Sequence, residues 1–576
     1  MNKPAIGLTF SGGGYRAATF DLGVLSFLNS VTLDDGGTLL DCVVAMSSVS
    51  GGTIPAMKYM LAQAQKQPVD EMIIEVFDFL CENDLVSLAL GRMSEEKANP
   101  KVSLIRIMAD IYDEHLFGHK NLGEIMDNFT RIHVKDYTAL ATDFSNALPF
   151  RFRVAEYLKS KDGKDKPFYV FGNNEHRINL EDARWITMGE AMACSSCFPG
   201  AFEPMMFPED FKFTREHREV AGKYLYADVN EEGDTEWRGF GIMDGGITDN
   251  EGIESILKAE ERRSLHYAST DGIEINDEDL DDECFDDEDT DVADSATKSF
   301  DLIIISDVSS PYIKKAYAPH DQWLWNWLGK LTVGRLGVNG LILSIALFGF
   351  LVIALMNGSI FWTVVTTGLF SIVTSLLCGG AWLKTRIHNV IAESFIGNRA
   401  RFINHMKFAV GESMLMNRAT SVLQMSSEVF LKRQRQLNYD RIHNDLEWKN
   451  RRISNLVYEL RDGKRGGKKA PIDPTLKPNA KIQRNSAKAA DMGTTLWFTD
   501  EDKQNAVPQA LLAAGQYTVC YNLIDYIDRI KRDSTNLSPA HATIIALRPR
   551  LRQLWEKFQE DPHWMIPEKW RIPNTE

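Results

Sequence analysis

Cysteine is scarce in this 576-residue chain, which holds seven cysteines scattered along its length. An odd and dispersed set does not provide the regular disulfide framework of a small secreted domain. Cys194 and Cys197 have the spacing of a metal-binding pair, but no second pair accompanies them. We therefore expect small residues in a tight segment at that position, with no metal and no cofactor.

A secretory signal is also missing, because Met1-Asn2-Lys3 leads directly into sequence typical of a folded domain. Nucleic-acid binding is not expected, since the basic stretch 461–490 carries no interleaved aromatic residues. Both absences favour a protein that folds in the cytosol and does not act on nucleic acid.

Charge of either sign is absent from residues 336–383, about twice the length that one membrane span needs. Asn357-Gly358-Ser359 divides this run into Leu336–Met356 and Ile360–Leu383. The pattern predicts a transmembrane helical hairpin, and the alternative is a helical hairpin buried in a large soluble core. Tryptophans expected at a membrane interface flank the run: Trp323, Trp325, Trp327 and Trp382.

The flanks of the apolar run are basic, with Lys330 and Arg335 before it and Lys384, Arg386 and His388 after it. The positive-inside rule therefore places both ends of the hairpin in the cytoplasm. We predict a membrane protein with two spans whose folded domain faces the cytoplasm.

The net charge of −16 comes mainly from one segment. Residues 271–294 carry fourteen acidic side chains and no lysine or arginine, which predicts a disordered, solvated loop. Calcium binding is the alternative, but the segment lacks the glycine and the spacing of an EF-hand loop.

A glycine-rich turn lies near the start of the chain. The apolar residues 4–10 predict a strand, Gly12-Gly13-Gly14 follow, and helical spacing begins after Tyr15. Glycines between a strand and a helix leave backbone N–H groups free to bind a phosphate or a developing oxyanion. Their spacing matches neither the dinucleotide fingerprint nor the phosphate loop.

A second turn carries Ser50, in Ser48-Val49-Ser50-Gly51-Gly52. The apolar run 40–46 predicts a strand before this turn, and the residues after Gly52 predict a helix. A nucleophilic serine on such a turn needs small residues two positions to either side, and Ser48 and Gly52 meet that need. A turn of small residues without chemistry is the alternative interpretation.

A third motif is Asp244, which follows the predicted strand 241–243 and precedes Gly245-Gly246. By itself it could be an ordinary Asp-Gly turn. Two further stretches accompany these motifs, Leu140-Ala141-Thr142-Asp143 and the segment 193–204 with its Cys-Phe-Pro-Gly-Ala-Phe sequence.

Taken together, these motifs resemble the patatin-like phospholipases in their order and spacing, over roughly residues 4–312. The resemblance implies a three-layer α/β/α core and hydrolysis by a Ser–Asp dyad. Ser50 would be the nucleophile, Asp244 the general base, and Gly12, Gly13 and Gly14 the oxyanion hole. The family has glycine where this chain has Ser48, which puts the geometry of the turn in question.

Arg16 is a further residue that the resemblance singles out. It would orient the glycine loop or contact a lipid phosphate, and the alternative is a salt bridge at the surface of the first helical turn. Membrane phospholipids are the expected substrates. We expect the basic stretch 461–490 to be a solvated loop, and contact with anionic lipid headgroups is the alternative.

Two other functions remain open. An α/β-hydrolase with a histidine base has a similar serine turn, and the chain has 12 histidines, including His266 and His320 after Asp244. The second alternative is a membrane scaffold or sensor whose hydrolase domain has lost its activity.

We expect the following domain order: hydrolase core 1–312, interfacial linker 313–335, transmembrane hairpin 336–383, cytosolic helices 384–460, basic loop 461–490, return to the core 491–535, and C-terminal tail 536–576. The hairpin and the helical segment would thus be inserted into the hydrolase core.

Overall fold

The computed structural model describes residues 3–95, 103–155, 168–199, 201–216, 218–229, 235–270, 299–309, 330, 332–392, 407–462, 471–533 and 538–571. The expected acidic loop 271–294, Trp323, Trp325, Trp327 and His320 lie outside these residues. The chain divides into two compact units, Met1–Tyr312 with Phe430–Glu576, and Ile313–Val429.

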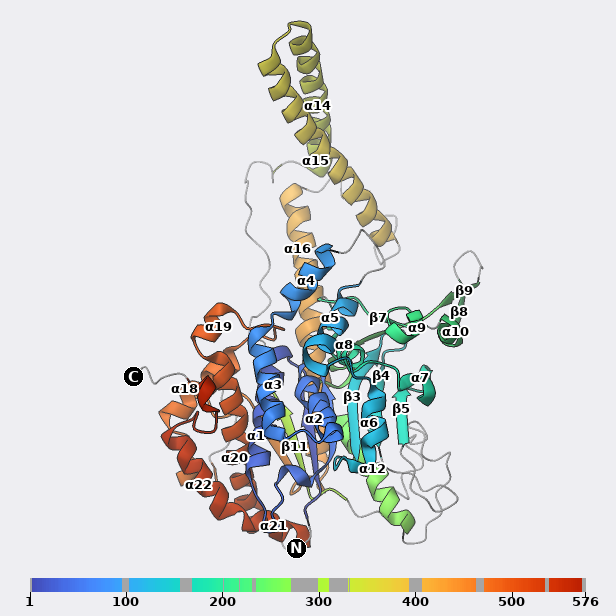
Figure 1. Ribbon diagram of the computed structural model, residues 1–576. Coiled ribbons are helices and arrows are strands. Elements are labelled where there is room, and N and C mark those ends of the chain that lie inside the picture. Colours follow the sequence, from blue (N-terminus) through green and yellow to red (C-terminus); the bar gives the residue numbers. More distant parts are fainter. Residues whose placement is uncertain are drawn as a thin grey trace. The chain divides into compact units, whose positions relative to one another are not determined.

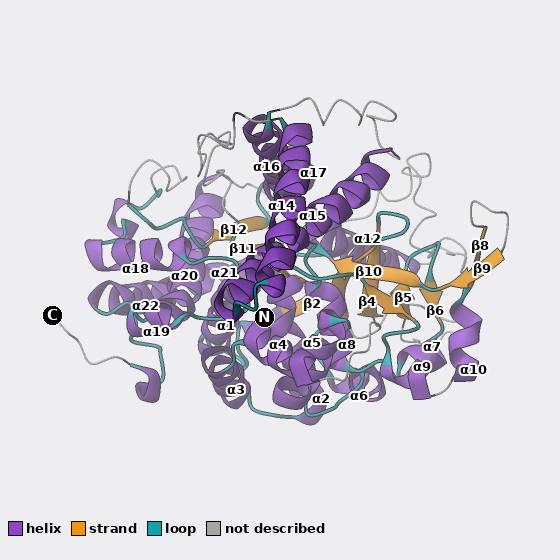
Figure 2. Ribbon diagram, turned by 90° about the horizontal axis from the view of Figure 1, so that it is seen from above, coloured by secondary structure: helices purple, strands orange, loops and turns teal. Residues whose placement is uncertain are grey.

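The first unit is built on a ten-stranded mixed sheet, seen from above as a row from β12 to β6 (Figure 2). Its strands are β1 (Ile6–Phe10), β2 (Val43–Val49), β3 (Asp136–Asp143), β4 (Leu148–Ala155), β5 (Phe168–Gly172), β6 (Arg177–Ile178), β7 (Met205–Phe207), β10 (Phe240–Asp244), β11 (Leu302–Asp307) and β12 (Arg452–Leu456). The order is β12-β11-β1-β2-β3-β4-β5-β6, with β10 paired to β3 and β7. A separate hairpin joins β8 (Tyr226–Val229) and β9 (Thr235–Arg238).

Strands from β12 to β3 are parallel, and those from β3 to β6 are antiparallel. β11 shows why the sheet lies between two layers. Its residues alternate, with Leu302 and Ile304 in one apolar cluster and Ile303 and Ile305 in another. Because successive side chains of a strand point to opposite faces, both faces of the sheet are covered.

The helices of the first unit complete these layers (Figure 1). They are α1 (Gly14–Ser30), α2 (Thr53–Gln65), α3 (Val69–Glu82), α4 (Leu85–Glu95), α5 (Leu104–Tyr112), α6 (Leu122–Asn128), α7 (Leu180–Ala183), α8 (Met188–Ser196), α9 (Lys212–Glu216), α10 (Arg218–Ala221), α11 (Gly246–Asp249), α12 (Ile253–Thr270), α17 (Leu431–Asn444), α18 (Ala480–Asp491), α19 (Asp500–Gln504), α20 (Val507–Asp533), α21 (Pro539–Ala546) and α22 (Arg548–Glu560). α1, α2, α3 and α20 contribute to the larger cluster, and α12 and α17 to the smaller one. The expected three-layer α/β/α core is thereby confirmed.

α20 comes from the far end of the chain and packs closely on α1. A Cβ on Gly23 would lie 2.2 Å from the Leu512 carbonyl oxygen, and a Cβ on Gly515 would lie 2.0 Å from that of Phe20. Only glycine allows the two backbones to approach this closely. Residues after the inserted unit are therefore an integral part of the core of the first unit.

Three expected segments differ from the structure. Residues 384–460 include β12 as well as helices, since Arg452–Leu456 pairs with β11. The short alternation of this strand, with Ile453 and Asn455 buried, is easily hidden in a region of helical spacing.

The expected basic loop 461–490 is helical from Ala480, where Asn479 accepts hydrogen bonds from the N–H groups of Lys481 and Ile482. α18 buries Ile482, Ser486 and Ala489, while its lysines lie on the other side. Lys481, Arg484 and Lys488 lie on the solvent face of this amphipathic helix, and basic residues on such a face are easily taken for a loop. Residues 463–470 of the expected loop lie outside the described residues.

The expected C-terminal tail 536–576 is instead folded as α21 and α22. Trp555 and Phe558 of α22 are fully buried in the larger cluster. Its many charged residues, including Arg548, Arg550 and Arg552, concealed a narrow apolar stripe of three residues.

The second unit contains α14 (Val333–Met356), α15 (Ile360–Ala392) and α16 (Phe408–Gln424). α14 and α15 form a hairpin, with a hydrogen bond of 3.0 Å between the hydroxyls of Ser344 and Thr374. Val338–Met356 and Ile360–Cys378 are long and apolar enough to cross a membrane, and only 11% and 6% of their residues are buried. These values give weak support to the expected hairpin and fit a buried soluble core poorly.

Candidate active site

Ser50 lies on the sharp turn between β2 and α2. Its φ of 49° is positive, a conformation that costs energy in a residue with a side chain and often marks a functional position. Its side chain is nearly buried, with 8% of the residue exposed. The strand, turn and helix expected around this serine are all present.

The turn closes tightly because two glycines follow the serine. A Cβ on Gly51 would lie 2.1 Å from the Gly14 carbonyl oxygen, and a Cβ on Gly52 would lie 2.7 Å from that of Ser11. Any side chain there would push the glycine loop away from Ser50. Glycine is therefore required at Gly51 and Gly52 so that the serine turn and the glycine loop can pack closely against each other.

Ser195, at the end of α8, fixes the turn from the other side. Its hydroxyl accepts a hydrogen bond of 3.0 Å from the Ser50 N–H and donates one of 2.7 Å to the Leu140 carbonyl. Thr53 lies at 3.0 Å from the same hydroxyl. Nothing local in the segment 193–204 predicts this contact of Ser195, because its partners lie more than 50 residues away in the sequence.

The register of the sheet brings Asp244 to Ser50. β2 ends at Val49, which lies opposite Leu140 on β3. β10 runs antiparallel to β3 and ends at Asp244, opposite the next residue, Ala141. The two strand ends meet on the same side of β3, which brings Ser50 next to Asp244. The Ser50 side chain lowers the pKa of the Asp244 carboxyl, against the larger effect of burial.

Burial gives Asp244 the character of a base. The residue is 2% exposed, and this desolvation raises the pKa of its carboxyl to about 6, against the opposing effect of hydrogen bonds from Ser50 and the Gly246 N–H. The Gly246 N–H donates to Oδ1 at 2.7 Å. A carboxylate with this pKa is ionised at neutral pH and takes up a proton more readily than an exposed one.

The glycine loop lies beside the serine, where a Cβ on Gly12 would be 3.2 Å from that of Ser50. Gly13 and Gly14 have positive φ values of 151° and 59°. Among the described residues, no acceptor is found for the N–H groups of Gly13 and Gly14. The Gly12 N–H differs, because it donates to the Asn250 carbonyl at 2.9 Å. Of the three expected oxyanion-hole residues, Gly12 thus has a structural hydrogen bond, while Gly13 and Gly14 have free donors.

Arg16 is 5% exposed and donates to the Met492 carbonyl at 2.8 Å. The expected alternative of a surface salt bridge is therefore wrong, since the guanidinium lies inside the core. Burial lowers its pKa to about 10, while the charge of Asp307 acts in the opposite direction. This hydrogen bond joins Arg16, in the first turn of α1, to the segment before α19.

Ser48 does not disturb the turn. It is buried in β2, and its hydroxyl lies 3.1 Å from that of Tyr137 on the neighbouring strand. The extra side chain relative to glycine is accommodated by this polar pair, away from Ser50. The departure from the family pattern has a local structural explanation.

The histidine alternative receives no support from the described residues, in which no histidine forms a hydrogen bond with Ser50 or Asp244. His176 pairs with Asp143 at 2.6 Å and stacks on Phe240. The side chain of His266 lies outside the description.

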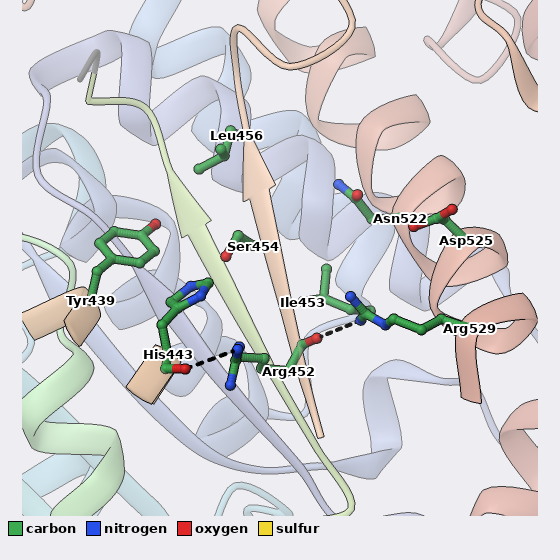
Figure 3. A pocket seen from close by; sticks show the side chains of 9 residues that line it. All are labelled: Tyr439, His443, Arg452, Ile453, Ser454, Leu456, Asn522, Asp525 and Arg529. Carbon is green, nitrogen blue, oxygen red and sulfur yellow. Dashed lines mark hydrogen bonds between the residues drawn. The ribbon is translucent and has the colours of Figure 1, made fainter. Parts of the chain in front are cut away.

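A cavity of about 290 Å³ lies elsewhere, along β12 (Figure 3). Its lining includes Tyr439, His443, Arg452 and Arg529, and neither Ser50 nor Asp244. Within the described residues no group of acidic, histidine or cysteine side chains could hold a metal ion, and the six cysteines found there are free.

The first unit thus presents a serine with positive φ, a buried carboxylate beside it, and two N–H groups of a glycine loop without an acceptor among the described residues. These three elements are what acyl transfer requires: a nucleophile, a base and a site for the oxyanion.

Comparison with known proteins finds a family match for part of the chain and distant structural neighbours. Residues 8–257 match the family model of the patatin-like phospholipases. Human GIVD cytosolic phospholipase A2 shows 14% identity over 48% of this chain and 47% of its own, with a TM-score of 0.27. The same human protein in complex with methyl gamma-linolenyl fluorophosphonate shows 16% identity over 38% and 31% of the two chains, with a TM-score of 0.23. The matches thus span about half or less of these structures' own length. No curated protein matches the chain in sequence.

Proposed function

Because residues 8–257 form a patatin-like phospholipase domain, we propose that this chain is a membrane-anchored lipid acyl hydrolase that uses Ser50 and Asp244 as a catalytic dyad. The observation that carries this proposal is the meeting of β2 and β10 on β3, which joins Ser50 to a buried carboxylate. The substrate class is ester lipids, with phospholipids as the expected members.

The first half of the reaction forms an acyl-enzyme. Ser50 Oγ attacks the ester carbonyl carbon while its proton passes to the carboxylate of Asp244. The carbonyl oxygen becomes an oxyanion, which the N–H groups of Gly13 and Gly14 stabilise. When the C–O bond breaks, the proton passes from Asp244 to the leaving alkoxide and releases the lysolipid.

The second half returns the enzyme to its starting state. A water molecule gives a proton to Asp244 and attacks the acyl carbon, and the Ser50 ester bond breaks with that proton returning to Oγ. The products are a fatty acid and a regenerated serine. One carboxylate serves both halves, so no histidine is needed.

The hairpin of α14 and α15 supports the proposal that the enzyme is anchored in the membrane that contains its substrate. Large apolar side chains such as Ile345, Phe350 and Val364 are mostly exposed to solvent in this unit. Such surface is unstable in water and stable in a bilayer. The basic flanks, from Lys330 and Arg335 to Lys384 and Arg386, favour an orientation with the hydrolase on the cytoplasmic side.

Anionic headgroups form a second proposed contact, on the basic residues of 461–490. Lys481, Arg484 and Lys488 lie on α18, at its partly or fully exposed positions. Their contribution would weaken as salt concentration rises.

Fatty-acid release from phospholipid vesicles tests the proposed function. The full chain, purified in detergent and reconstituted, should release one fatty acid and one lysophospholipid per reaction. Mass spectrometry of the lipids would show both products and the acyl position. Absence of both products from vesicles of several headgroup compositions would refute the proposal.

The pH dependence of the reaction follows from Asp244. Its pKa is raised to about 6, and only the ionised form can accept the serine proton. We expect kcat/KM to be constant above about pH 7 and to fall about tenfold per pH unit below pH 6. A rate profile between pH 4.5 and 8.5, with folding monitored by circular dichroism, measures this. If a histidine were the base, the inflection of the profile would lie near about pH 6.5 to 7. Replacement of that histidine would then abolish the reaction.

A further inference from the structure

The two ends of the inserted unit are joined by an ion pair. β11 ends at Asp307 before the chain enters Ile313–Val429, and the chain returns to the first unit at Phe430. Five residues later, Arg435 on α17 binds Asp307, with Nη2 at 2.5 Å and Nε at 3.0 Å from Oδ2. The guanidinium of Arg435 thus links the segment that precedes the inserted unit to the segment that follows it.

This ion pair lies in a buried and mainly acidic environment. Asp307 and Glu251 are both fully buried, and Arg435 Nε lies 3.6 Å from Glu251 Oε1. Burial, and then the charge of Asp307, hold the pKa of the Glu251 carboxyl well above its usual range. Other residues of α17 also contribute hydrogen bonds, since Tyr439 donates to Asp307 and Asn438 to Asp249.

The neighbours of these two carboxylates hold the glycine loop. On one side, Ser306 accepts the Ser11 N–H at 3.0 Å and the Val308 N–H donates to the Ser11 hydroxyl at 3.0 Å. On the other side, Asn250 accepts the Gly12 N–H at 2.9 Å. The residues that fix the loop are therefore the chain neighbours of Asp307 and Glu251.

We propose that Arg435 is a positioning residue of the hydrolase site. By pairing with Asp307 and Glu251, it holds together the two segments that fix Ser11 and Gly12, and so keeps Gly13 and Gly14 in the geometry of an oxyanion site. Catalysis then depends on correct docking of the chain that leaves the membrane hairpin. This inference rests on the proposed function.

Arginine suits this role better than lysine. Its planar fork uses Nε and Nη2 together on Asp307, and Nε also faces Glu251. Lysine would offer one compact charge without this fixed geometry. A conservative replacement should therefore recover only part of the effect.

The test compares Arg435→Met and Arg435→Lys with Arg441→Gln in the full chain. Arg441 is a matched control, because it lies on the same helix and pairs with Glu254 at 3.2 Å, but its side chain is 57% exposed. We expect Arg435→Met to lower kcat about 100-fold with KM changed less than about threefold, because a small displacement of the oxyanion donors affects the transition state alone. Arg435→Lys should be intermediate and Arg441→Gln unchanged. Equal kcat for Arg435→Met and the wild type would overturn the inference.

A loss of folding must be separated from a loss of positioning, because Arg435→Met leaves two buried carboxylates without a cation. The variant Arg435→Met/Glu251→Gln/Asp307→Asn replaces both buried carboxyls by neutral amides and should recover Tm. We expect its kcat to stay at least about tenfold below that of the wild type, since the bidentate tie is still missing. Full recovery of kcat together with Tm would show that Arg435 only balances charge.

Amide hydrogen exchange gives a readout that does not need activity. In Arg435→Met, exchange at residues 11–16 should be at least about tenfold faster, while exchange at residues 137–143 of β3 should be unchanged. Unchanged exchange at residues 11–16 would refute the inference even if the wild type were inactive. An inactive wild type with the expected exchange pattern would refute the proposed function alone.

Discussion

Replacement of Ser50 by alanine is expected to lower fatty-acid release at least about 10⁴-fold, close to the level without enzyme. The reason is that no acyl-enzyme can form, while the glycine loop and Asp244 can still bind and polarise an ester. Initial rates on reconstituted vesicles measure the effect, with free fatty acid quantified by mass spectrometry.

The matched control for this variant is Ser48→Ala, two residues earlier, on β2. Its hydroxyl contacts Tyr137, so the variant should lose a hydrogen bond worth about 1 kcal/mol and keep its rate within a few-fold. A Ser50→Ala protein that retains more than a few per cent of the wild-type rate would show that the nucleophile lies elsewhere.

Replacement of Asp244 by asparagine should have the second largest effect on rate, and an opposite effect on stability. We expect kcat to fall about 10³- to 10⁴-fold, because the amide cannot accept the serine proton. The side chain keeps its shape and can still accept the Gly246 N–H, so the site should remain folded.

The stability effect follows from the raised pKa of Asp244. A carboxyl whose pKa rises from 3.8 to about 6 on folding favours the folded state, and this contribution is fully present below about pH 4. That contribution is lost as pH rises through about 6, where the buried carboxylate is charged. The neutral asparagine removes this cost, so the variant should be more stable than the wild type by about 1 to 3 kcal/mol at pH 8 and not at pH 4.

Urea unfolding at the two pH values measures this difference, and Asp113→Asn is the matched control. Asp113 is another buried carboxyl whose pKa burial raises to about 6, and it accepts the Gly189 N–H away from Ser50. It should show a similar gain in stability at pH 8 and no large loss of rate. An Asp244→Asn protein with nearly normal kcat would remove Asp244 from the mechanism.

The turns that carry the candidate site residues were predictable because each is local in the sequence. Gly12–Gly14, Ser50 and Asp244 each combine a strand end with small residues, and the steric needs of tight turns restrict the residues that fit there. The three-layer core was predictable for a similar reason, through apolar runs such as 302–305. The uncharged length of residues 336–383 made the hairpin visible without any structural knowledge.

What holds these motifs together was not predictable, because it depends on contacts between distant parts of the chain. The meeting of Val49 and Asp244 on β3 follows from strand register, which no local pattern encodes. Ser195, Arg435 and the five-residue strand β12 look ordinary in sequence and acquire their roles through partners 100 or more residues away. Arg16 was noticed, but its burial against Met492 was not foreseeable from a position at the first turn of a helix.

The most direct test of the Ser–Asp dyad is covalent labelling with an alkyl fluorophosphonate, followed by peptide mass spectrometry. This reagent forms a stable adduct with a serine only when the hydroxyl is activated. We predict one adduct, on Ser50, in the wild type, and a labelling rate reduced at least about 1000-fold in Asp244→Asn. An active protein that carries its adduct on another residue, or that labels equally fast without Asp244, would contradict the account.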